Sequence, residues 1–454
     1  ITRRKNTIGN RFAWGSYMSP SCPSFPKPFE YIMIFAKDNI KLQTTGETDL
    51  TPKEFKKWAY SVWNIAPETK MKKIGHPACV DSNTECLTSK GWKKHNELKI
   101  GDTIASFNMK IGNIEWDKIK NITTYFHNGD AIKINGRHLD MILSPNHDSI
   151  IQKEYHTINK PKFRKRKADQ LKKRDLIPCS AKWNIGNKKY SKTPSKELSG
   201  LLGWFLSEGY FIKNKKTGKI YNIYIDQSIT TNLKKVKKIE KLLLSLNADY
   251  KKYTRNKKHT YNNNMSSEIA TFSISKKIKN DILSLCGENR NIPEDVLMWN
   301  EESLKTFFFS MTDGDGHYRK TTKSFLFTQW KNKSYLDFMQ AIGVRLGYDA
   351  YLSYSNKYVE FTHKKHKCLR NSKESLINKE KYIGIMWCPF VENNNSFVAR
   401  RNGKIYISGN PDGEIIKWGV PFLEVDPEWI GWKPIYEPLT RQKEVYENVF
   451  IKVP

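Results

Sequence analysis

Two stretches of this chain combine an apolar run with small residues, and each ends in an acidic residue followed by glycine. Residues 198–210 (LSGLLGWFLSEGY) form the first stretch, and residues 305–318 (KTFFFSMTDGDGHY) repeat its plan. Each pattern predicts a buried helix that is closed by a glycine cap, Gly209 in one and Gly316 in the other. Small residues would let the two helices pack closely: Gly200, Gly203, Ser207, Ser310 and Gly314.

Each predicted helix carries a carboxylate on its last turn, Glu208 in the first and Asp315 in the second. A carboxylate at the negative end of a helix dipole is disfavoured by a few tenths to about 1 kcal/mol. Two such acids would also repel each other, and a divalent cation between them would remove both objections. The pattern therefore indicates a metal site at Glu208 and Asp315, with two buried helices and exposed acids as the alternative. Asp313 is a weaker candidate, because Asp315 directly precedes the capping glycine.

The elements that follow the two helices repeat in the same order. In the first half we expect a strand at 220–227, an amphipathic helix at 232–246 and a basic hairpin region at 249–264. In the second half we expect a strand at 324–330, a helix at 334–346 and the corresponding segment at 347–362. The repeat implies a pseudo-twofold monomer in which two sheets form one saddle.

The charge of the chain indicates a polyanionic partner. The 454 residues carry a formal net charge of +32, and the sequence pI is about 9.6. Lysine and arginine are interleaved with many aromatic residues, a composition that suits phosphate contacts with stacking beside them. Nucleic acid is the simplest such partner, although charge alone does not identify a reaction.

The two helical motifs resemble those of the LAGLIDADG (DOD-type) homing endonucleases. Residues 201–209 (LLGWFLSEG) match the first motif, and residues 308–316 (FFSMTDGDG) match the second. The resemblance implies that Glu208 and Asp315 are metal-binding catalytic acids and that the cofactor is Mg²⁺. It also implies that both strands of a specific double-stranded DNA site are hydrolysed. A catalytically degenerate DNA-binding relic is the alternative.

Residues 290–297 (RNIPEDVL) resemble the K-x-I-P block that the same family carries between its halves. Arg290 stands where lysine is usual, and arginine stabilises phosphate charge but does not carry a titrating proton. Side chains from the strands would contact base edges in the major groove. The candidate DNA contacts are Lys213, Lys215, Lys216, Arg255, Lys257, Lys258 and Arg290. For the lysines and Arg255, a solvated charged loop is the alternative.

A second resemblance begins at Cys79. Residues 79–108 are a run of short strands broken by turns, and they resemble the opening block of inteins, the self-splicing domains of the Hedgehog/intein fold. Residues 140–150 (DMILSPNHDSI) match the second intein block, with Ser144 in the threonine place and His147 in the histidine place.

In that family the thiol of the first residue attacks the preceding carbonyl group and forms a thioester. Here Cys79 would attack the carbonyl carbon of Ala78, and His147 would polarise that bond or protonate its leaving nitrogen. Ser144 would hold the scissile peptide by a hydrogen bond. A buried structural cysteine and a histidine in a turn are the alternatives.

The last part of the intein resemblance covers residues 381–410. A hairpin is expected at 396–408, centred on Asn402 and Gly403, which are a strong signal for a type I′ turn. Asn410 takes the place of the terminal asparagine that cyclises and cuts the chain.

Three positions depart from the intein pattern. The usual penultimate histidine is Gly409, and the usual internal histidine of the block is Asn395, so general-acid help is missing. The residue after Asn410 is Pro411, which offers no thiol or hydroxyl for transesterification. Standard splicing is therefore not expected, although a thioester at Cys79 would still hydrolyse.

The flanks follow a different pattern. Residues 1–78 resemble a stretch of the amino-group DNA methyltransferases, through residues 14–20 (WGSYMSP), 63–68 (WNIAPE) and 75–78 (GHPA). The cofactor-binding F-x-G-x-G motif and the catalytic D-P-P-Y or S-P-P-Y tetrapeptide are absent, so no methyl transfer is expected. A methyltransferase fragment remains an alternative identity. Residues 411–454 follow no pattern that assigns them a function beyond downstream host sequence.

These resemblances predict a multi-domain α+β protein, in which an all-β Hedgehog/intein splicing domain is interrupted by a pseudo-twofold αββαββα LAGLIDADG endonuclease. The predicted order is a host segment at 1–78, a splicing half at 79–186, the endonuclease at 187–380, a second splicing half at 381–410 and a host segment at 411–454. Residues 168–178 (ADQLKKRDLIP) resemble the strand that closes the first half of the intein fold. Residues 160–196 as a whole are expected to be a basic linker into the endonuclease. Autoprocessing would need no cofactor.

The seven cysteines are an odd number with no framework spacing, which favours a reducing compartment, the cytoplasm in a microbial or viral setting. No apolar run of about 18 residues and no signal peptide occurs, so we expect no membrane partner. We expect a monomer on double-stranded DNA. Because the chain begins at Ile1 rather than Met, we also expect a fragment of a longer protein.

Overall fold

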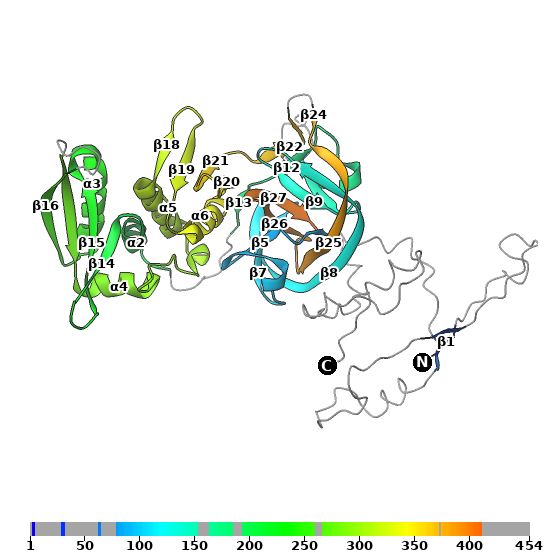
Figure 1. The fold of residues 1–454 in the computed structure, drawn as a ribbon, viewed down its shortest axis with the longest axis horizontal. Coiled ribbons are helices and arrows are strands. Elements are labelled where there is room, and N and C mark those ends of the chain that lie inside the picture. Colours follow the sequence, from blue (N-terminus) through cyan, green and yellow to red (C-terminus); the bar gives the residue numbers. More distant parts are fainter. Residues whose placement is uncertain are drawn as a thin grey trace, which may run out of the picture. The chain divides into compact units, whose positions relative to one another are not determined.

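The computed structural model describes residues 2–4, 29–31, 62–64, 79–152, 163–184, 193–258, 266–371 and 374–410. The chain divides into two compact units, Ile1–Gly75 and His76–Pro454. Within the second unit we distinguish the large-sheet domain, residues 79–184 and 366–410, from the two-half domain, residues 193–362, which is inserted into it (Figure 1).

In the first unit, three short strands form a small sheet. Strand β1 (Thr2–Arg4) pairs antiparallel with β2 (Phe29–Tyr31) and parallel with β3 (Val62–Asn64). The rest of the predicted methyltransferase-like segment, and all of residues 411–454, lie outside the described residues. None of the helices in the described part of the chain is long and apolar enough to cross a membrane.

The large-sheet domain is built from strands. They are β4 (Val80–Asp81), β5 (Glu85–Thr88), β6 (Gly91–Lys93), β7 (Thr103–Asn108), β8 (Asn113–Asn135), β9 (Asp140–Leu143), β10 (Asp148–Gln152), β11 (Phe163–Lys167), β12 (Leu176–Pro178), β13 (Lys182–Trp183), β22 (His366–Cys368), β25 (Ile377–Val391), β26 (Ser396–Arg401) and β27 (Lys404–Gly409). Two 3₁₀ turns, η2 (His95–Glu97) and η3 (Ala168–Gln170), and a short hairpin of β23 (Arg370–Asn371) and β24 (Glu374–Ser375) complete it.

These strands form one 14-stranded sheet among the described residues, in the order β22-β12-β10-β27-β26-β5-β7-β8-β25-β4-β9. Outside this order, β6 pairs with β5, β11 with β10 and β13 with β8. Strand β9 also pairs with β8, so this end of the sheet closes on itself (Figure 1). The β-branched residues of the strands pack around Trp387 and Tyr406 in a buried core. Asn402 and Gly403 have φ angles of 46° and 74°, as a type I′ turn requires, which confirms the predicted hairpin of β26 and β27.

The two-half domain repeats one order of elements. The first half contains α2 (Lys196–Glu208), β14 (Gly209–Lys213), β15 (Ile220–Ser228), α3 (Ile229–Ser245), β16 (Tyr250–Lys258), β17 (Ser266–Ile274) and α4 (Lys276–Cys286). The second contains η4 (Val296–Met298), α5 (Glu301–Asp315), β18 (Gly316–Arg319), β19 (Ser324–Thr328), α6 (Lys333–Arg345), β20 (Asp349–Ser353) and β21 (Tyr358–Thr362). The sheets have the matching orders β14-β15-β17-β16 and β18-β19-β21-β20, so the predicted duplication is confirmed at the level of elements.

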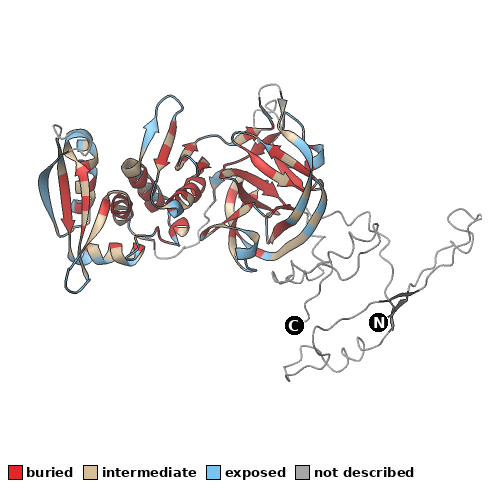
Figure 2. Ribbon diagram, viewed as in Figure 1, coloured by how far each residue is buried: buried red, intermediate tan, exposed pale blue. Residues whose placement is uncertain are grey.

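The core of the two-half domain lies between its helices and sheets. Figure 2 shows buried residues concentrated on α2, α5 and the inner strands, with exposed residues on β16 and at the tip of the β18–β19 hairpin. In β15 the buried residues alternate, Ile223, Ile225 and Gln227, as expected of a strand with one covered face. The described residues contain both helices and strands, which agrees with the predicted multi-domain α+β class.

The boundaries between the two domains differ from those predicted. Strand β22 pairs with β12, and β25 begins at Ile377, so the chain returns to the large sheet before the predicted boundary at residue 381. Residues 163–184 of the predicted linker form β11, β12 and β13. Strand β12 lies within the strand expected at residues 168–178. Strand β11 (FRKRK) was not expected, because lysine and arginine stems can cover a sheet without showing apolar alternation.

The two glycine caps form for a different reason from the one predicted. Gly209 and Gly316 do follow the last helical residues, but their φ angles are −102° and −147°, which is extended backbone open to any residue. A Cβ atom at Gly209 would lie 2.7 Å from the carbonyl oxygen of Phe205 and 2.8 Å from that of Tyr224. Glycine is therefore needed because helix and strand meet closely, not because the chain turns left-handed.

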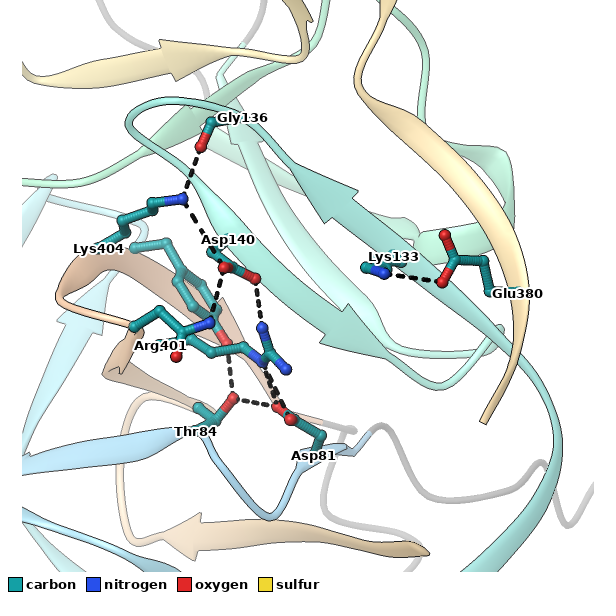
Figure 3. A network of polar contacts seen from close by, with 10 residues as sticks. Asp81, Thr84, Lys133, Gly136, Asp140, Glu380, Arg401 and Lys404 are labelled. Carbon is teal, nitrogen blue, oxygen red and sulfur yellow. Dashed lines mark hydrogen bonds and ion pairs between the residues drawn. The ribbon is translucent and has the colours of Figure 1, made fainter. Parts of the chain in front are cut away.

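A buried network of charges joins the first and last strands of the large-sheet domain (Figure 3). The Arg401 guanidinium donates to Asp81 on β4, at 3.0 Å, and to Asp140 on β9, at 2.5 Å. The Lys404 ammonium donates to the main-chain oxygen of Gly136 and lies 3.7 Å from Asp140. The start of the domain is thereby fixed to the hairpin that precedes Asn410.

Arg401→Met is expected to destabilise the protein by about 3–5 kcal/mol, because buried Asp81 would lose its ion pair and Asp140 would be left with the more distant Lys404 as its cationic partner. Chemical denaturation followed by tryptophan fluorescence measures the loss. Lys133→Met is the matched control, since Lys133 pairs with Glu380 at the surface, and its effect should stay below about 1 kcal/mol. Equal effects of the two substitutions would contradict the assigned role of the network.

Candidate active sites

Helices α2 and α5 pack together along the small residues that the sequence singled out. A Cβ atom added at Gly203 would lie 2.8 Å from the Cβ of Ser310 and 2.9 Å from the carbonyl oxygen of Phe307. At Gly314 an added Cβ would overlap the side chain of Ser207. The two helix backbones therefore approach each other directly, without intervening side chains.

This packing brings the two predicted acids to neighbouring helix ends. Glu208 ends α2 and Asp315 ends α5, and a Cβ at Gly314 would lie 3.6 Å from Cγ of Glu208. Burial raises the pKa of Asp315 to about 7, and the nearby Glu208 carboxylate contributes to the rise. Burial also raises the pKa of Glu208. The site concentrates negative charge where solvent screens it poorly.

Each acid is held by a glutamine that the sequence analysis missed. Gln227 donates from Nε2 to Oε1 of Glu208 at 3.2 Å, and Gln329 donates from Nε2 to Oδ2 of Asp315 at 3.1 Å. Gln227 lies near the end of β15 and Gln329 directly follows β19, so the two halves supply equivalent groups. A glutamine in corresponding places of both halves was the signal that could have revealed them.

Arg290 and Asp313 take positions that clarify their roles. The Arg290 guanidinium donates to the carbonyl oxygens of Phe205, at 3.0 Å, and Leu206, at 2.7 Å, at the end of α2. Its charge offsets the negative helix end, and it also lowers the pKa of Asp315 against the rise that burial causes. Asp313 pairs with Lys238 of α3 at 2.5 Å. Its carboxylate is therefore engaged outside the Glu208–Asp315 pair.

Glu208 and Asp315 suit a hard divalent cation. Among the described residues no three or more histidine, cysteine, aspartate or glutamate side chains gather in a metal-binding group. The two acids still offer oxygen ligands, and the Glu208 carboxylate adds to the rise in the pKa of Asp315 that burial causes, so a cation beside the pair would be favoured. Mg²⁺ commonly binds through one or two carboxylates and completes its shell with water and substrate phosphate oxygens. The donor set therefore fits Mg²⁺.

The candidate DNA contacts lie on the first half. Lys213, Lys215 and Lys216 are exposed at and after the end of β14, and Lys213 pairs with Glu288 at 2.9 Å. Arg255 on β16 is exposed and pairs with Asp226. The backbone of Lys257 and Lys258 continues β16, but their side chains lie outside the described residues.

Large aromatic side chains are exposed in both halves of the domain: Tyr221 and Tyr253 in the first, and Tyr318 and Trp330 in the second. A base or sugar can stack on such a ring, so their exposure suits a nucleic-acid surface.

Cys79, Ser144 and His147 meet in the core of the large-sheet domain. The Cys79 main-chain N–H donates to Oγ of Ser144 at 3.1 Å, and the Ser144 N–H donates back to the Cys79 carbonyl oxygen at 3.0 Å. The His147 N–H donates to the Ser144 carbonyl oxygen, and His147 Nε2 lies 2.9 Å from the hydroxyl oxygen of Ser408. Burial raises the pKa of the Cys79 thiol, and the neighbouring thiol of Cys388 adds to the effect.

Asn410 is buried beside the same residues. The Cys388 thiol donates to Oδ1 of Asn410 at 3.1 Å, and the Asn410 amide donates to the main-chain oxygen of Pro389. Lys165 donates from Nζ to the main-chain oxygen of Asn410 at 2.7 Å. Cys388 and Lys165 were missed by the sequence analysis, because neither lies in a segment that the intein resemblance assigns to chemistry.

Comparison with known proteins gives partial similarities. No family model matches the chain. The Type II methyltransferase M.MjaVI of Methanocaldococcus jannaschii is 38% identical over 70 residues, which are 15% of this chain. The chain covers 36% of the length of that relative.

Two solved structures illustrate the structural similarities. The homing endonuclease I-DmoI in complex with DNA and Mn is 19% identical, with a TM-score of 0.27, over 38% of this chain and 89% of that one. An AceL NrdHF class 3 split intein is 14% identical, with a TM-score of 0.20, over 24% of this chain and 69% of that one.

Glu208→Gln is expected to stabilise the metal-free protein at pH 8. Asp315 has an ordinary pKa near 4 when unfolded and about 7 when folded, so the folded state binds more protons between these values and stability falls as pH rises through them. Removing the Glu208 charge lowers the pKa of Asp315 in the folded protein, so stability decreases less as pH rises. Each 1 kcal/mol gained would raise Tm by roughly 2–4 °C.

Melting curves in EDTA from pH 5 to pH 9 measure the difference. Glu294→Gln, at an exposed site, is the control and should track the wild-type protein. Parallel profiles for Glu208→Gln and wild type would show that the two acids do not interact.

Proposed function

We propose that the two-half domain is a LAGLIDADG homing endonuclease that cuts both strands of a specific double-stranded DNA site. The observation that carries this proposal is the meeting of Glu208 and Asp315 at neighbouring ends of α2 and α5, each held by a glutamine from its own half. The matched sheets, the exposed tyrosines and the net charge of +32 support DNA as the substrate.

In this proposal each half supplies one acid for one DNA strand. Glu208 and Asp315 would hold Mg²⁺, which when bound acts as a Lewis acid on the phosphate and lowers the pKa of its water. Gln227 and Gln329 fix the directions of the two carboxylates. Arg290 keeps the end of α2 in place and brings fixed positive charge toward the scissile phosphates. The degenerate alternative would bind DNA without cutting it.

We also propose that the large-sheet domain processes its own chain. The Cys79 thiol would attack the carbonyl carbon of Ala78, forming a carbon–sulfur bond while the bond to the Cys79 nitrogen breaks and that nitrogen takes up a proton. The hydrogen bond from the Cys79 N–H to Ser144 supports this role, because it fixes the scissile peptide at its leaving nitrogen. His147, fixed between Ser144 and Ser408, would supply the proton.

Cleavage rather than ligation is the proposed outcome at the second junction. Asn410 would cyclise, but Pro411 offers no nucleophile to accept the upstream segment. The 70-residue similarity to M.MjaVI supports a methyltransferase as the host protein. We further propose a monomer in a reducing cytoplasm; the six described cysteines are free thiols.

Asp315→Asn is expected to slow DNA cleavage by about 100-fold to 1,000-fold or more, because one half loses its charged ligand. The substrate is DNA that encodes residues 1–78 joined directly to residues 411–454, incubated with Mg²⁺. Asp313→Asn is the matched control and should keep activity, since Asp313 pairs with Lys238. Binding without cutting by the wild-type protein would favour the degenerate alternative.

Cys79→Ala is expected to abolish thiol-induced cleavage before residue 79, measured by intact mass after addition of dithiothreitol. Because burial raises the pKa of the Cys79 thiol, little thiolate exists at neutral pH, and the wild-type rate should increase as pH rises. Cys368→Ala, on β22, is the control and should cleave like wild type. A wild-type chain that stays intact at every pH would disprove this activity.

A further inference from the structure

A lysine from a distant strand contacts the bond that the second cleavage would break. Lys165 on β11 donates from Nζ to the main-chain oxygen of Asn410, with 2.7 Å between the two atoms. Asn410 is fully buried and Lys165 is partly buried. A charged donor in such a place polarises a carbonyl group more strongly than one in bulk water, because the local dielectric is lower.

The residue before Asn410 has no room for a side chain. Gly409 ends β27, and a Cβ atom there would overlap the main-chain oxygen of Asp148. An imidazole at this penultimate position would therefore not fit beside β10. A donor to the Asn410 carbonyl has to come from another strand, and β11, which pairs with β10, carries Lys165 to it.

The other polar groups around Asn410 are engaged elsewhere. Cys388 and Pro389 contact the side-chain amide of Asn410, not its main-chain oxygen. The Asn410 N–H donates to the carbonyl oxygen of Asn395. His147 faces the Ser408 hydroxyl through Nε2. Lys165 thus has the position from which charge on the Asn410 oxygen can be stabilised.

We propose that Lys165 is a catalytic residue for cleavage of the bond between Asn410 and Pro411, an inference that rests on the autoprocessing function proposed above. The side-chain nitrogen of Asn410 attacks its own carbonyl carbon, a carbon–nitrogen bond closes a succinimide ring, and the bond to the Pro411 nitrogen breaks. The amide proton moves to the proline nitrogen, so the step needs no co-reactant. Lys165 donates to the oxygen on which negative charge develops.

The test compares the two junctions in one full-length chain. Lys165→Met should slow cleavage after Asn410 by about 100-fold to 1,000-fold, the usual loss for an oxyanion donor, while thiol-induced cleavage before Cys79 keeps its rate. Intact mass identifies the reaction, because a succinimide end is one water lighter than a hydrolysed end. Lys165→Arg should recover part of the rate, since it keeps a charged donor. Lys173→Met, at an exposed lysine, removes the same charge and should cleave normally.

The possible outcomes separate this inference from the function on which it rests. Equal cleavage after Asn410 by Lys165→Met and wild type would overturn the role of Lys165. A matching loss at both junctions, or an arginine variant as slow as the methionine variant, would mark a structural role and also overturn it. So would a wild-type chain that reacts at Cys79 but never cleaves after Asn410. A wild-type chain inert at both junctions would refute autoprocessing itself.

Discussion

The contact between α2 and α5 is the constraint on which the two-half domain depends. Because Gly203 and Gly314 carry no side chains, the helix backbones pack in direct contact, and the acids at the helix ends lie close enough to affect each other's charge. Larger residues along this seam would separate the helices and remove the mutual effect of Glu208 and Asp315. The same contact joins the two sheets, since each sheet continues directly from the end of one of these helices. The geometry of the acids and the spacing of the sheets are therefore set together.

The large-sheet domain tolerates the insertion because both ends of the insert belong to its own sheet. Strand β12, just before the insert, pairs with β22, just after it, so the two ends of the insert are held next to each other by the sheet itself. The insert is also fixed to the hairpin of β26 and β27. Arg400 on β26 is buried and donates to Asp337 of α6, at 2.5 Å, and Gln340 donates to the main-chain oxygen of Gly403 at 2.8 Å. The hairpin that leads to Asn410 therefore contacts both the large sheet and helix α6 of the insert.

The sequence predicted the elements better than the contacts. The helix period, the paired acids and the Asn402–Gly403 turn each follow from local rules, and the corresponding elements formed where expected. Local rules do not reveal Gln227, Gln329, Cys388 and Lys165, because their partners lie on other strands and helices. Only the two glutamines left a sequence signal, their corresponding places in the two halves. Strand β11 was missed for a similar reason, since its sequence (FRKRK) carries no apolar alternation, and the partners of its basic side chains, Asp148, Asp175 and Asn410, lie elsewhere in the chain.

The two sites deal with charge in opposite ways. At the ends of α2 and α5 two carboxylates are brought together, so that binding of a cation would relieve repulsion already present in the folded protein. Around Cys79 and Asn410 the groups that would react are neutral, and burial keeps the Cys79 thiol protonated by raising its pKa. In the proposed autoprocessing, reactivity would therefore come from alignment and, at Asn410, from the charge of Lys165. Alignment depends on strands from both ends of the domain, so a chain that has not closed its sheet would hold neither proposed cleavage site in a reactive position.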